Sequence, residues 1–389
     1  MTDPNPVRPA APRANHRLGP RPLLLHLMLA MRTWENQPAG PPSSGASAPA
    51  GCPRPAGPGN IAGLSVDARL VAGIAAYRRH PGERTLADPP VIWAEGGSRL
   101  LDYGRAEASP VLFVPSLVNR AHVLDLMEGA SMLRYLSAGG VRPLLLDWGD
   151  PDAAERRFTL TDYIAGRLER AIVAVGRPVT LAGYCMGGLM AVASALRRPD
   201  LVQRLALLAT PWDFWSPNRA AATAVAAFGV ACEPALMLAG ALPVDALQTL
   251  FALAEPGGVA VKYREFASLD QQSERAHRFV ALEDWLNDGV PLAAPVAREI
   301  LDGWYGANSP ALGAWRVAGA PVRPEALRTE IFIALPARDR IVPPESAMAL
   351  ARCLPQAVVH RPQAGHVGMI AGSNARAELW TPLLNWLRG

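Results

Sequence analysis

The chain has 389 residues, enough for two or three domains or for one large α/β domain with an insertion. Half of the residues are hydrophobic, and 38 basic against 34 acidic side chains leave a formal charge of +4, too small a bias for a surface that grips nucleic acid. The four cysteines form no Cys-x-x-Cys pair, which excludes a cysteine-rich zinc site and a disulfide framework and favours a reducing cytoplasm.

The first sixty residues are rich in Pro and Gly and contain one short apolar segment, Leu23–Trp34. Its apolar side chains recur at helical spacing. The most apolar part, Leu23–Met31, is far shorter than the ~20 residues of a membrane-spanning helix and lacks the flanks of a signal peptide. We expect this segment to dock on the main domain or to be disordered, with a surface anchor as the alternative.

The middle of the chain alternates short apolar runs with helical patterns. We predict a helix over Ile61–Arg79, and then a hairpin that turns at Gly96-Gly97. The continuous apolar runs that follow are typical of buried strands in a parallel sheet with crossover helices. These runs are Val111–Val114, Pro143–Asp147, Val179–Ala182 and Leu205–Leu208.

The alternation stops after Phe214 and resumes at Glu330, and the patterns between them are helical, as in Ala221–Phe228 and Val244–Leu253. We interpret this stretch as a helical cap inserted into the sheet domain. The predicted division is an extension (1–60), a first part of the core (61–216), the cap (217–326) and a second part of the core (327–389). Strands near Ile331–Leu335 and Ala357–His360 and helices near Pro344–Cys353 and Asn374–Leu387 complete the sheet domain.

The sharpest motif is Gly183-Tyr184-Cys185-Met186-Gly187, placed between an apolar strand and a helix-like run. This is the Gly-x-nucleophile-x-Gly pattern of a nucleophile elbow, with cysteine where serine is commonest. The helix N-terminus behind Cys185 favours the thiolate, and the backbone N–H of Met186 can donate to an oxyanion. The alternative is that Cys185 is a small buried hydrophobe.

A nucleophile of this type needs a base and an acid, which in this fold follow in the order nucleophile, acid, histidine. Asp339 follows the strand Ile331–Leu335, and His366 lies between Gly365 and Gly368 just past the next strand. Both positions are at the carboxyl ends of strands, where ligands bind in open α/β sheets. For the second oxyanion donor we choose the backbone N–H of Val118, in the loop after Val111–Val114. The predicted fold class is therefore α/β, an α/β-hydrolase fold with a mostly parallel sheet and an inserted helical cap.

Beyond this pattern, the sequence resembles the polyhydroxyalkanoate synthase family of the α/β-hydrolase superfamily, from about residue 90 to the C-terminus. The motifs that carry the resemblance are Leu117-Val118-Asn119-Arg120 with Leu124-Asp125-Leu126, Leu146-Asp147-Trp148-Gly149, Leu160-Thr161-Asp162-Tyr163, the Cys185 elbow, Thr210-Pro211-Trp212-Asp213, Asp339 with Ile341-Val342-Pro343, and Gly365-His366-Val367-Gly368. Arg340 departs from the family, which commonly has histidine directly after the aspartate, and the cap motif around Trp285 is only loosely similar.

The resemblance implies an acyltransferase that polymerises (R)-3-hydroxyacyl-CoA through an acyl thioester on Cys185, with His366 and Asp339 as base and acid. It implies no metal or bound cofactor, because coenzyme A enters as the substrate's carrier. Asn119 and Asp125 are candidate substrate contacts, as are Trp212 and Trp285, which are equally typical of core. The implied partners are the polyester granule surface and a second synthase subunit or a second copy of the chain, in the cytoplasm or at granules. A thioesterase or intracellular depolymerase with the same triad is the alternative, and a non-catalytic surface protein is a third reading.

Overall fold

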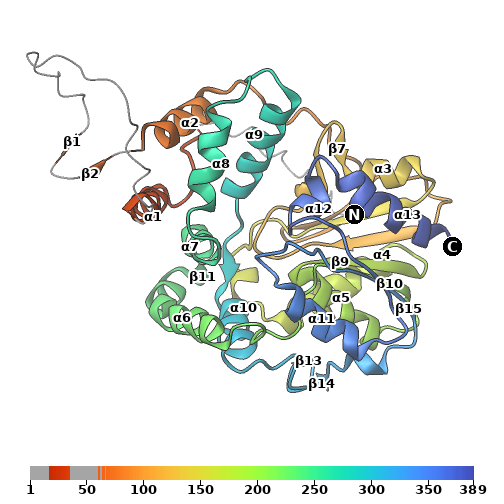
Figure 1. Ribbon diagram of the computed structural model, residues 1–389. Helices are drawn as coiled ribbons and strands as arrows, with labels where there is room; N and C mark the ends of the chain where they lie inside the picture. The colour runs from red at the N-terminus through yellow and green to blue at the C-terminus, as the bar shows by residue number, and fades with distance from the viewer. Residues whose placement is uncertain (1–16, 36–59, 62–63, 66) are drawn as a thin grey trace, which may run out of the picture.

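The computed structural model describes residues 17–35, 60–61, 64–65 and 67–389. Its centre is an eight-stranded sheet in the order β16-β15-β10-β9-β5-β8-β4-β3 (Figure 1). The strands are β3 (Val91–Glu95), β4 (Ser98–Asp102), β5 (Pro110–Val114), β8 (Arg142–Asp147), β9 (Val179–Tyr184), β10 (Val202–Leu208), β15 (Glu330–Ala334) and β16 (Val358–His360). The six strands from β16 to β8 are parallel, and the hairpin β3–β4 joins antiparallel at one edge. The predicted strands and hairpin are confirmed.

Side chains of the central strands alternate between two hydrophobic cores, as the period of two along a strand requires. In β5, Leu112 and Val114 belong to one core, and Val111 and Phe113 to the other. The first core is covered by α4 (Glu169–Ala174), which continues the π-helix Asp162–Leu168, and by α5 (Met186–Arg197) and α11 (Pro344–Cys353). The sheet is therefore buried on both faces, which explains why its strands read as unbroken apolar runs.

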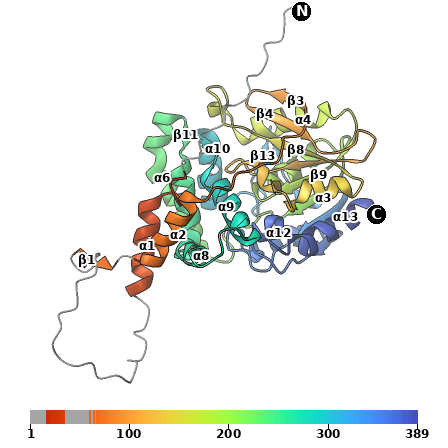
Figure 2. The same ribbon diagram turned by 90° about the horizontal axis from the view of Figure 1, so that it is seen from above.

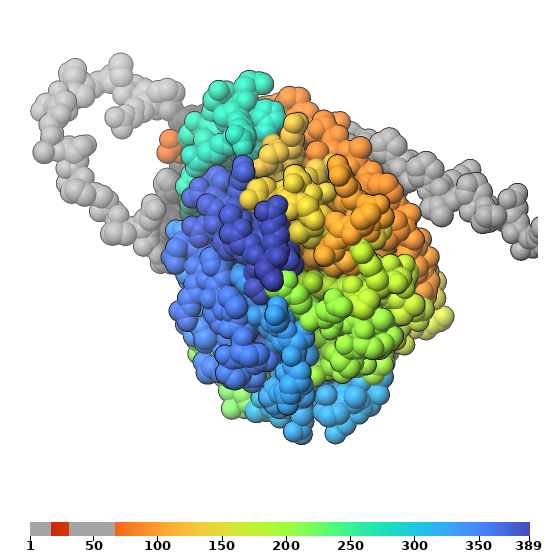
Figure 3. Space-filling view, turned by 90° about the vertical axis from the view of Figure 1, so that its right-hand side faces the viewer, coloured from red at the N-terminus to blue at the C-terminus, as the bar shows by residue number. Residues whose placement is uncertain are grey.

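The second core is covered by α3 (Met132–Ala138), α12 (Gly368–Ala371), the π-helix Arg376–Trp380 and α13 (Thr381–Arg388). On the surface the C-terminal segment lies against the segment that contains α3 (Figure 3). Tyr135 packs on Trp380 with ring centroids 5.6 Å apart, and Arg388 donates to the carbonyl of Gly139 at 2.9 Å. These contacts fasten the end of the chain to its first half.

The segment between β10 and β15 is mainly helical and lies beyond the carboxyl ends of the strands (Figure 1). It contains α6 (Arg219–Ala239), α7 (Val244–Ala254), α8 (Gly258–Phe266), α9 (Glu274–Asn287), α10 (Ala294–Arg298) and the π-helix η4 (Glu299–Gly306). Short hairpins complete it: β11 (Ala241–Leu242) pairs with β12 (Leu292–Ala293), and β13 (Arg316–Val317) with β14 (Ala320–Pro321).

One inserted helix is longer than its sequence pattern predicts. The periodicity indicated a helix over Ala221–Phe228, but α6 runs from Arg219 to Ala239 and passes Pro234 without ending. By length and composition α6 would suit a membrane span, with mean hydropathy 1.6 and only 17% of its apolar window buried, although ordinary core helices pass the same test. Its outward side exposes Val230 and Leu238, at 71% and 92%.

The N-terminal helix α1 (Leu23–Glu35) packs beside α2 (Ala68–Arg79) and α8 in a third, smaller core (Figure 2). Ala30 and Tyr77 are buried there against Tyr263, whereas Leu24 and Met28 remain exposed. In the predicted division α2 belongs to the sheet domain, but it packs against the N-terminal segment and the inserted helices. The helix also starts at Ala68, capped by Asp67, and not near Ile61.

Candidate active site

The nucleophile candidate Cys185 lies at the turn between β9 and α5, as the motif predicts. Its backbone has φ +56° and ψ −127°, a conformation that L-residues adopt at a cost of about 1–3 kcal/mol. The neighbouring chain holds this turn, because Cys185 N–H donates to the carbonyl of Leu208 at 2.8 Å and its own carbonyl accepts from Gly188 at 2.9 Å. The side chain is half-buried at the carboxyl edge of the sheet.

Three glycines make the turn possible because each is approached too closely for a side chain. A Cβ on Gly183 would lie 2.4 Å from Gly188 Cα, and one on Gly187 would lie 2.0 Å from the carbonyl oxygen of Val114. A Cβ on Gly188 would lie 1.9 Å from Thr210 Oγ1. The elbow is therefore pressed against the ends of the two neighbouring strands, β5 and β10.

His366 and Asp339 lie in the loops after β16 and β15 and are in direct contact. His366 Nδ1 is 2.7 Å from Asp339 Oδ2, and both residues are buried. The other carboxylate oxygen, Oδ1, accepts the backbone N–H groups of Ile341 at 2.9 Å and Val342 at 2.8 Å. These bonds fix the carboxylate, which in turn fixes the ring orientation of His366.

The charge on His366 depends on its neighbours. Burial by itself lowers the pKa of this imidazole, but the negative charge of Cys185, followed by that of Asp339, and hydrogen bonds to both raise the pKa to about 10. Tyr184 stacks on the His366 ring with centroids 5.0 Å apart, and its hydroxyl donates to the His366 carbonyl at 3.3 Å. The site therefore favours the protonated imidazolium form of His366.

The two predicted oxyanion donors are Met186, within the elbow itself, and Val118, in the loop after β5. Met186 is the first residue of α5, where a backbone N–H has no partner within its own helix. Val118 N–H makes only a long contact of 3.4 Å with Ser116 Oγ. The Val118 carbonyl accepts from Val290 N–H at 3.2 Å, so the inserted segment holds this loop.

The four candidate substrate contacts are placed very differently. Asn119 Oδ1 is buried and has no hydrogen-bond partner among the residues that the structure describes. Trp285 is buried and donates its indole N–H to the carbonyl of Arg120 at 2.7 Å, so it supports the loop. Asp125 has a fully buried carboxylate bonded to Arg84 at 3.0 Å and Arg134 at 2.8 Å, an ion-pair cluster that supports the fold.

Trp212 belongs to an aromatic cluster that joins the end of β10 to the inserted helices. Its ring meets Trp315 edge to face at 6.4 Å, and Trp315 meets Trp304 at 5.4 Å. Phe214 extends the cluster to Tyr305 at 5.0 Å. Burial, and then the negative charge of Cys185, raise the pKa of Tyr305 to about 12.

Two residues near the site, Tyr184 and Tyr305, were not among the predicted ones. Tyr184 occupies the variable position of the elbow motif, and its adjacency to Cys185 was a usable signal. Tyr305 lies in the inserted segment, where no local pattern marks it. Cys232 and Cys353 lie in helices as expected, and burial raises the pKa of both thiols. Cys52 lies outside the described residues.

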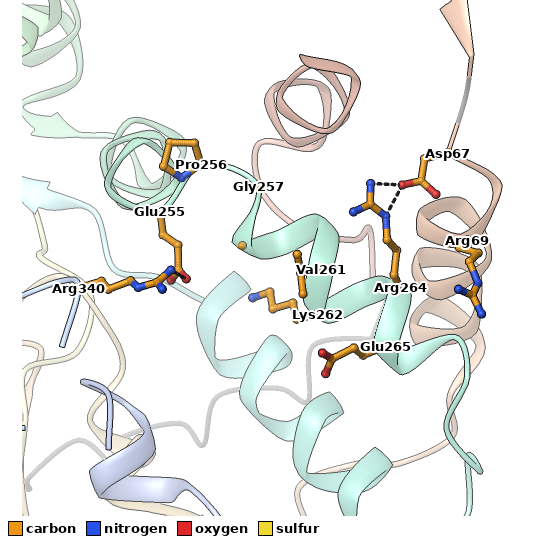
Figure 4. A pocket seen from close by; sticks show the side chains of 11 residues that line it. Asp67, Arg69, Glu255, Pro256, Gly257, Val261, Lys262, Arg264, Glu265 and Arg340 are labelled. Atoms are coloured by element: carbon orange, nitrogen blue, oxygen red, sulfur yellow. Dashed lines mark hydrogen bonds and ion pairs between the residues drawn. The ribbon is translucent and has the colours of Figure 1, made fainter. Parts of the chain in front are cut away.

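A cavity of about 590 Å³ lies at the junction of Arg340 with the α7–α8 connection (Figure 4). Arg340 reaches across it to Glu255 at 2.6 Å, and Arg264 is paired with Asp67. Lys262 also borders it. One of its lining residues, Arg340, directly follows Asp339 in the sequence, but Cys185 and His366 do not line the cavity. In the described part of the chain, no group of three His, Cys, Asp or Glu residues is arranged to hold a metal ion.

Residues 111–379 match the family model of the alpha/beta hydrolase family. The chain therefore belongs to the alpha/beta hydrolase family, as the sheet order and the elbow already indicate. An epoxide hydrolase from Bacillus megaterium, solved with an inhibitor, superposes with a TM-score of 0.50 at 15% identity, over 78% of this chain and 100% of that one. At this identity the likeness concerns the fold alone.

Within this family, the sequence is similar to curated poly(3-hydroxyalkanoate) polymerase subunits. The PhaC subunit of Synechocystis sp. is 28% identical over 72% of this chain and 77% of its own length. The PhaC subunit of Allochromatium vinosum is 28% identical over 76% of this chain and 87% of its own length. The resemblance to the polyhydroxyalkanoate synthase family is thereby confirmed.

Proposed function

We propose that this protein is an acyltransferase that polymerises (R)-3-hydroxyacyl-CoA into polyhydroxyalkanoate, with Cys185 as nucleophile and His366 and Asp339 as its base and acid. The observation that carries the proposal is the buried Asp339–His366 bond of 2.7 Å beside a cysteine on a strained elbow. The similarity to poly(3-hydroxyalkanoate) polymerase subunits supports the choice of substrate.

In the first step the Cys185 thiolate attacks the thioester carbonyl carbon of the substrate. The carbonyl oxygen becomes an oxyanion, which Met186 and Val118 N–H groups stabilise. The carbon–sulfur bond to coenzyme A then breaks, and the leaving thiolate takes the proton from the His366 imidazolium. The products are an acyl thioester on Cys185 and free coenzyme A, with no cofactor consumed.

In the second step the 3-hydroxyl of another unit attacks this thioester. His366 removes the hydroxyl proton, the new ester bond forms, and Cys185 leaves as a thiolate beside the imidazolium. Asp339 keeps the proton on Nδ1, so that Nε2 faces the reacting groups. Thioester exchange is nearly balanced in energy, so the acyl-enzyme keeps its reactivity. Water must therefore be excluded from the site, because it would otherwise hydrolyse the thioester before the 3-hydroxyl arrives.

The test is incubation of purified protein with (R)-3-hydroxybutyryl-CoA, measuring thiol release and identifying the product. Cys185→Ala should lower thiol release by roughly 10⁴-fold or more. The matched control is Cys353→Ala, which removes a thiol in α11 and should leave the rate within about twofold. Release with only free hydroxybutyrate would replace the polymerase by a thioesterase, and an unchanged Cys185→Ala rate would overturn the triad.

We also propose the polyester granule surface in the cytoplasm as the place of action, with a second synthase subunit or a second copy as partner. The exposed apolar side of α6 supports an apolar contact surface, because Val230, Met237 and Leu238 are more than 70% exposed. Leu238→Glu should reduce co-sedimentation with isolated granules while leaving thiol release unchanged. Equal co-sedimentation of both proteins would remove α6 from this role.

A further inference from the structure

Arg17, at the start of the described N-terminal segment, has a buried side chain that is paired with a carboxylate and two backbone carbonyls. Only 6% of its side chain is exposed, and Nε and Nη2 donate to the two carboxylate oxygens of Asp284 at 2.6 and 2.7 Å. The guanidinium also donates to the carbonyls of His80 and Gly82 and lies over the Tyr77 ring at 5.6 Å. Such a two-pronged arginine–carboxylate pair is directional as well as strong.

Further bonds tie the same segment to the last turn of α9. The backbone N–H of Arg21 donates to Asn287 Oδ1 at 3.2 Å, and its guanidinium donates to the Asn287 carbonyl at 3.3 Å. Tyr77 of α2 donates its hydroxyl to Asp284 at 2.8 Å. The N-terminal segment, α2 and α9 therefore meet at Asp284 and Asn287, on the side of the molecule where α1 and α2 lie together (Figure 2).

The same end of α9 is bonded, through other residues, to the loop after β5. Trp285 donates its indole N–H to the Arg120 carbonyl at 2.7 Å, and Arg120 pairs with Asp288 at 3.3 Å. Asn119 and Gly289 form an antiparallel bridge, and Val290 N–H donates to the Val118 carbonyl at 3.2 Å. Residues 284–290 thus link the N-terminal segment to residues 118–120.

We propose that Arg17 is a positioning residue for the second oxyanion donor of the active site. By holding Asp284 it fixes the end of α9, and the end of α9 fixes the peptide that carries Val118 N–H. This inference rests on the proposed function of the site. An oxyanion donor must be placed to within about 0.5 Å, and here its loop is bonded to an inserted helix, so any freedom of α9 reaches the donor.

The experiment compares Arg17→Ala and Arg17→Lys with the unchanged full-length protein. The matched control is Arg142→Ala, which breaks an equally short and well-buried ion pair with Asp102, 2.7 Å long, at the other end of the strands. Arg17→Ala should lower kcat for thiol release from (R)-3-hydroxybutyryl-CoA by roughly 10- to 100-fold with KM within about threefold. Arg17→Lys should recover part of the loss, and Arg142→Ala should stay within twofold. Equal effects of Arg17→Ala and Arg142→Ala would overturn the inference.

Two readouts distinguish positioning from a general loss of structure. Alkylation of Cys185 by iodoacetamide needs no oxyanion donor, so its rate should stay within twofold in Arg17→Ala while acyl transfer falls. Hydrogen exchange of the peptide amides at 116–122 should quicken in Arg17→Ala and not in Arg142→Ala. Parallel loss of alkylation and transfer, or unchanged exchange, would contradict the inference.

The exchange measurement also separates this inference from the proposed function. If the unchanged protein releases no thiol yet exchange at 116–122 quickens in Arg17→Ala, the proposed reaction is wrong and the mechanical link stands. If Arg17→Ala does not fold, Trp285→Phe breaks the same link at its far end and should also lower kcat by about tenfold. Arg17→Lys should then add little to Trp285→Phe, because both act through one connection, and additive effects would count against it.

Discussion

Asp125 and Asp339 are both buried carboxylates in the segments that follow strands of the sheet, but their surroundings differ in one respect. Asp125 is bonded to two arginines, Arg84 and Arg134, and to the Tyr103 hydroxyl at 3.1 Å. Asp339 is bonded to two backbone N–H groups and to His366. Two full positive charges surround the first carboxylate, and a titratable ring faces the second.

The difference appears in how the nearby groups titrate. Burial alone would raise the pKa of Asp125, but the hydrogen bonds from Arg134 and Ser131 and the charges of both arginines lower it. His122, three residues earlier in the chain, is half-buried near Arg84, and desolvation followed by that charge lowers its pKa to about 4. His366 has the opposite shift. A buried carboxylate that is paired with arginines stabilises the fold, whereas one that is hydrogen-bonded to a histidine can support proton transfer.

The largest loss of activity is expected for Asp339→Asn, which tests whether Asp339 differs from Asp125 in being catalytic. The amide can keep the contacts with Ile341 and Val342 but cannot offer a negative charge to His366. We expect kcat for acyl transfer to fall by roughly 10³- to 10⁴-fold, as replacing the acid of a triad does elsewhere, with a smaller loss of stability than for Asp125→Asn, because His366 can give up its proton. Thiol-release kinetics and urea unfolding measure the two quantities, and a kcat within tenfold of the original would make Asp339 no more catalytic than Asp125.

Asp125→Asn should give the opposite combination. The substitution leaves Arg84 and Arg134 without their carboxylate, and both guanidinium groups are only partly exposed, at 27% and 41% of the side chain. We expect the free energy of unfolding to fall by about 3 kcal/mol. The kcat per folded molecule should remain within about threefold. A large loss of kcat at unchanged stability would return Asp125 to the list of substrate contacts.

The pKa shifts of His122 and His366 predict that the free energy of unfolding falls at acid pH because of the first residue and at alkaline pH because of the second. His122 titrates near 4 when folded and near 6.5 when unfolded, so its contribution is present above pH 6.5 and is lost as pH falls from 6.5 to 4. The loss amounts to at most about 3 kcal/mol. His366 has a raised pKa, so its contribution is present below pH 6.5 and is lost as pH rises toward 10.

Urea unfolding between pH 4 and 7.5 tests the acid window, with His122→Asn as the variant. The variant should lose less stability than the original protein on acidification, because position 122 no longer carries an imidazole that the unfolded chain protonates more readily than the folded one. Parallel stability curves for the two proteins would mean that the fold does not hold His122 in its neutral form.

The sheet and the three triad candidates were accessible from sequence because their signals are local. A strand buried on both faces is a continuous apolar run, and the elbow, Asp339 and His366 each directly follow such a run. The role of Asp125 was not accessible, because Arg84 lies 41 residues from it and only the fold brings them together. For the same reason the sequence left Trp285 open between a substrate contact and a core residue, since its partner carbonyl, 165 residues away, belongs to the loop it supports.

The inserted helices were the least predictable part of the chain. α6 continues through Pro234 because its neighbours on η4 and α10 hold it, which the local pattern does not reveal. The N-terminal segment was correctly allowed to dock on the main body, but Arg17 itself carried no signal, since its partners come from α2 and α9. Contacts between segments this far apart depend on the tertiary structure alone.

The smallest expected change in stability concerns uncharged side chains. Here a buried hydroxyl with a hydrogen-bond partner, Ser346, is compared with one that has none in the described part of the chain, Thr210. Thr210 is 1% exposed beside the elbow, and its Oγ1 has no hydrogen-bond partner among the described residues. Ser346 is equally buried, but its Oγ accepts the backbone N–H of Trp212 at 3.2 Å.

Thr210→Val replaces an unpaired hydroxyl with a methyl group of similar size, so stability should be unchanged or rise by up to about 1 kcal/mol. Ser346→Ala should cost about 1–2 kcal/mol, because Trp212 N–H loses its acceptor. Urea unfolding of both variants measures the difference, and a loss above 1 kcal/mol in Thr210→Val would mean that a bound water pairs with Thr210 beside Cys185.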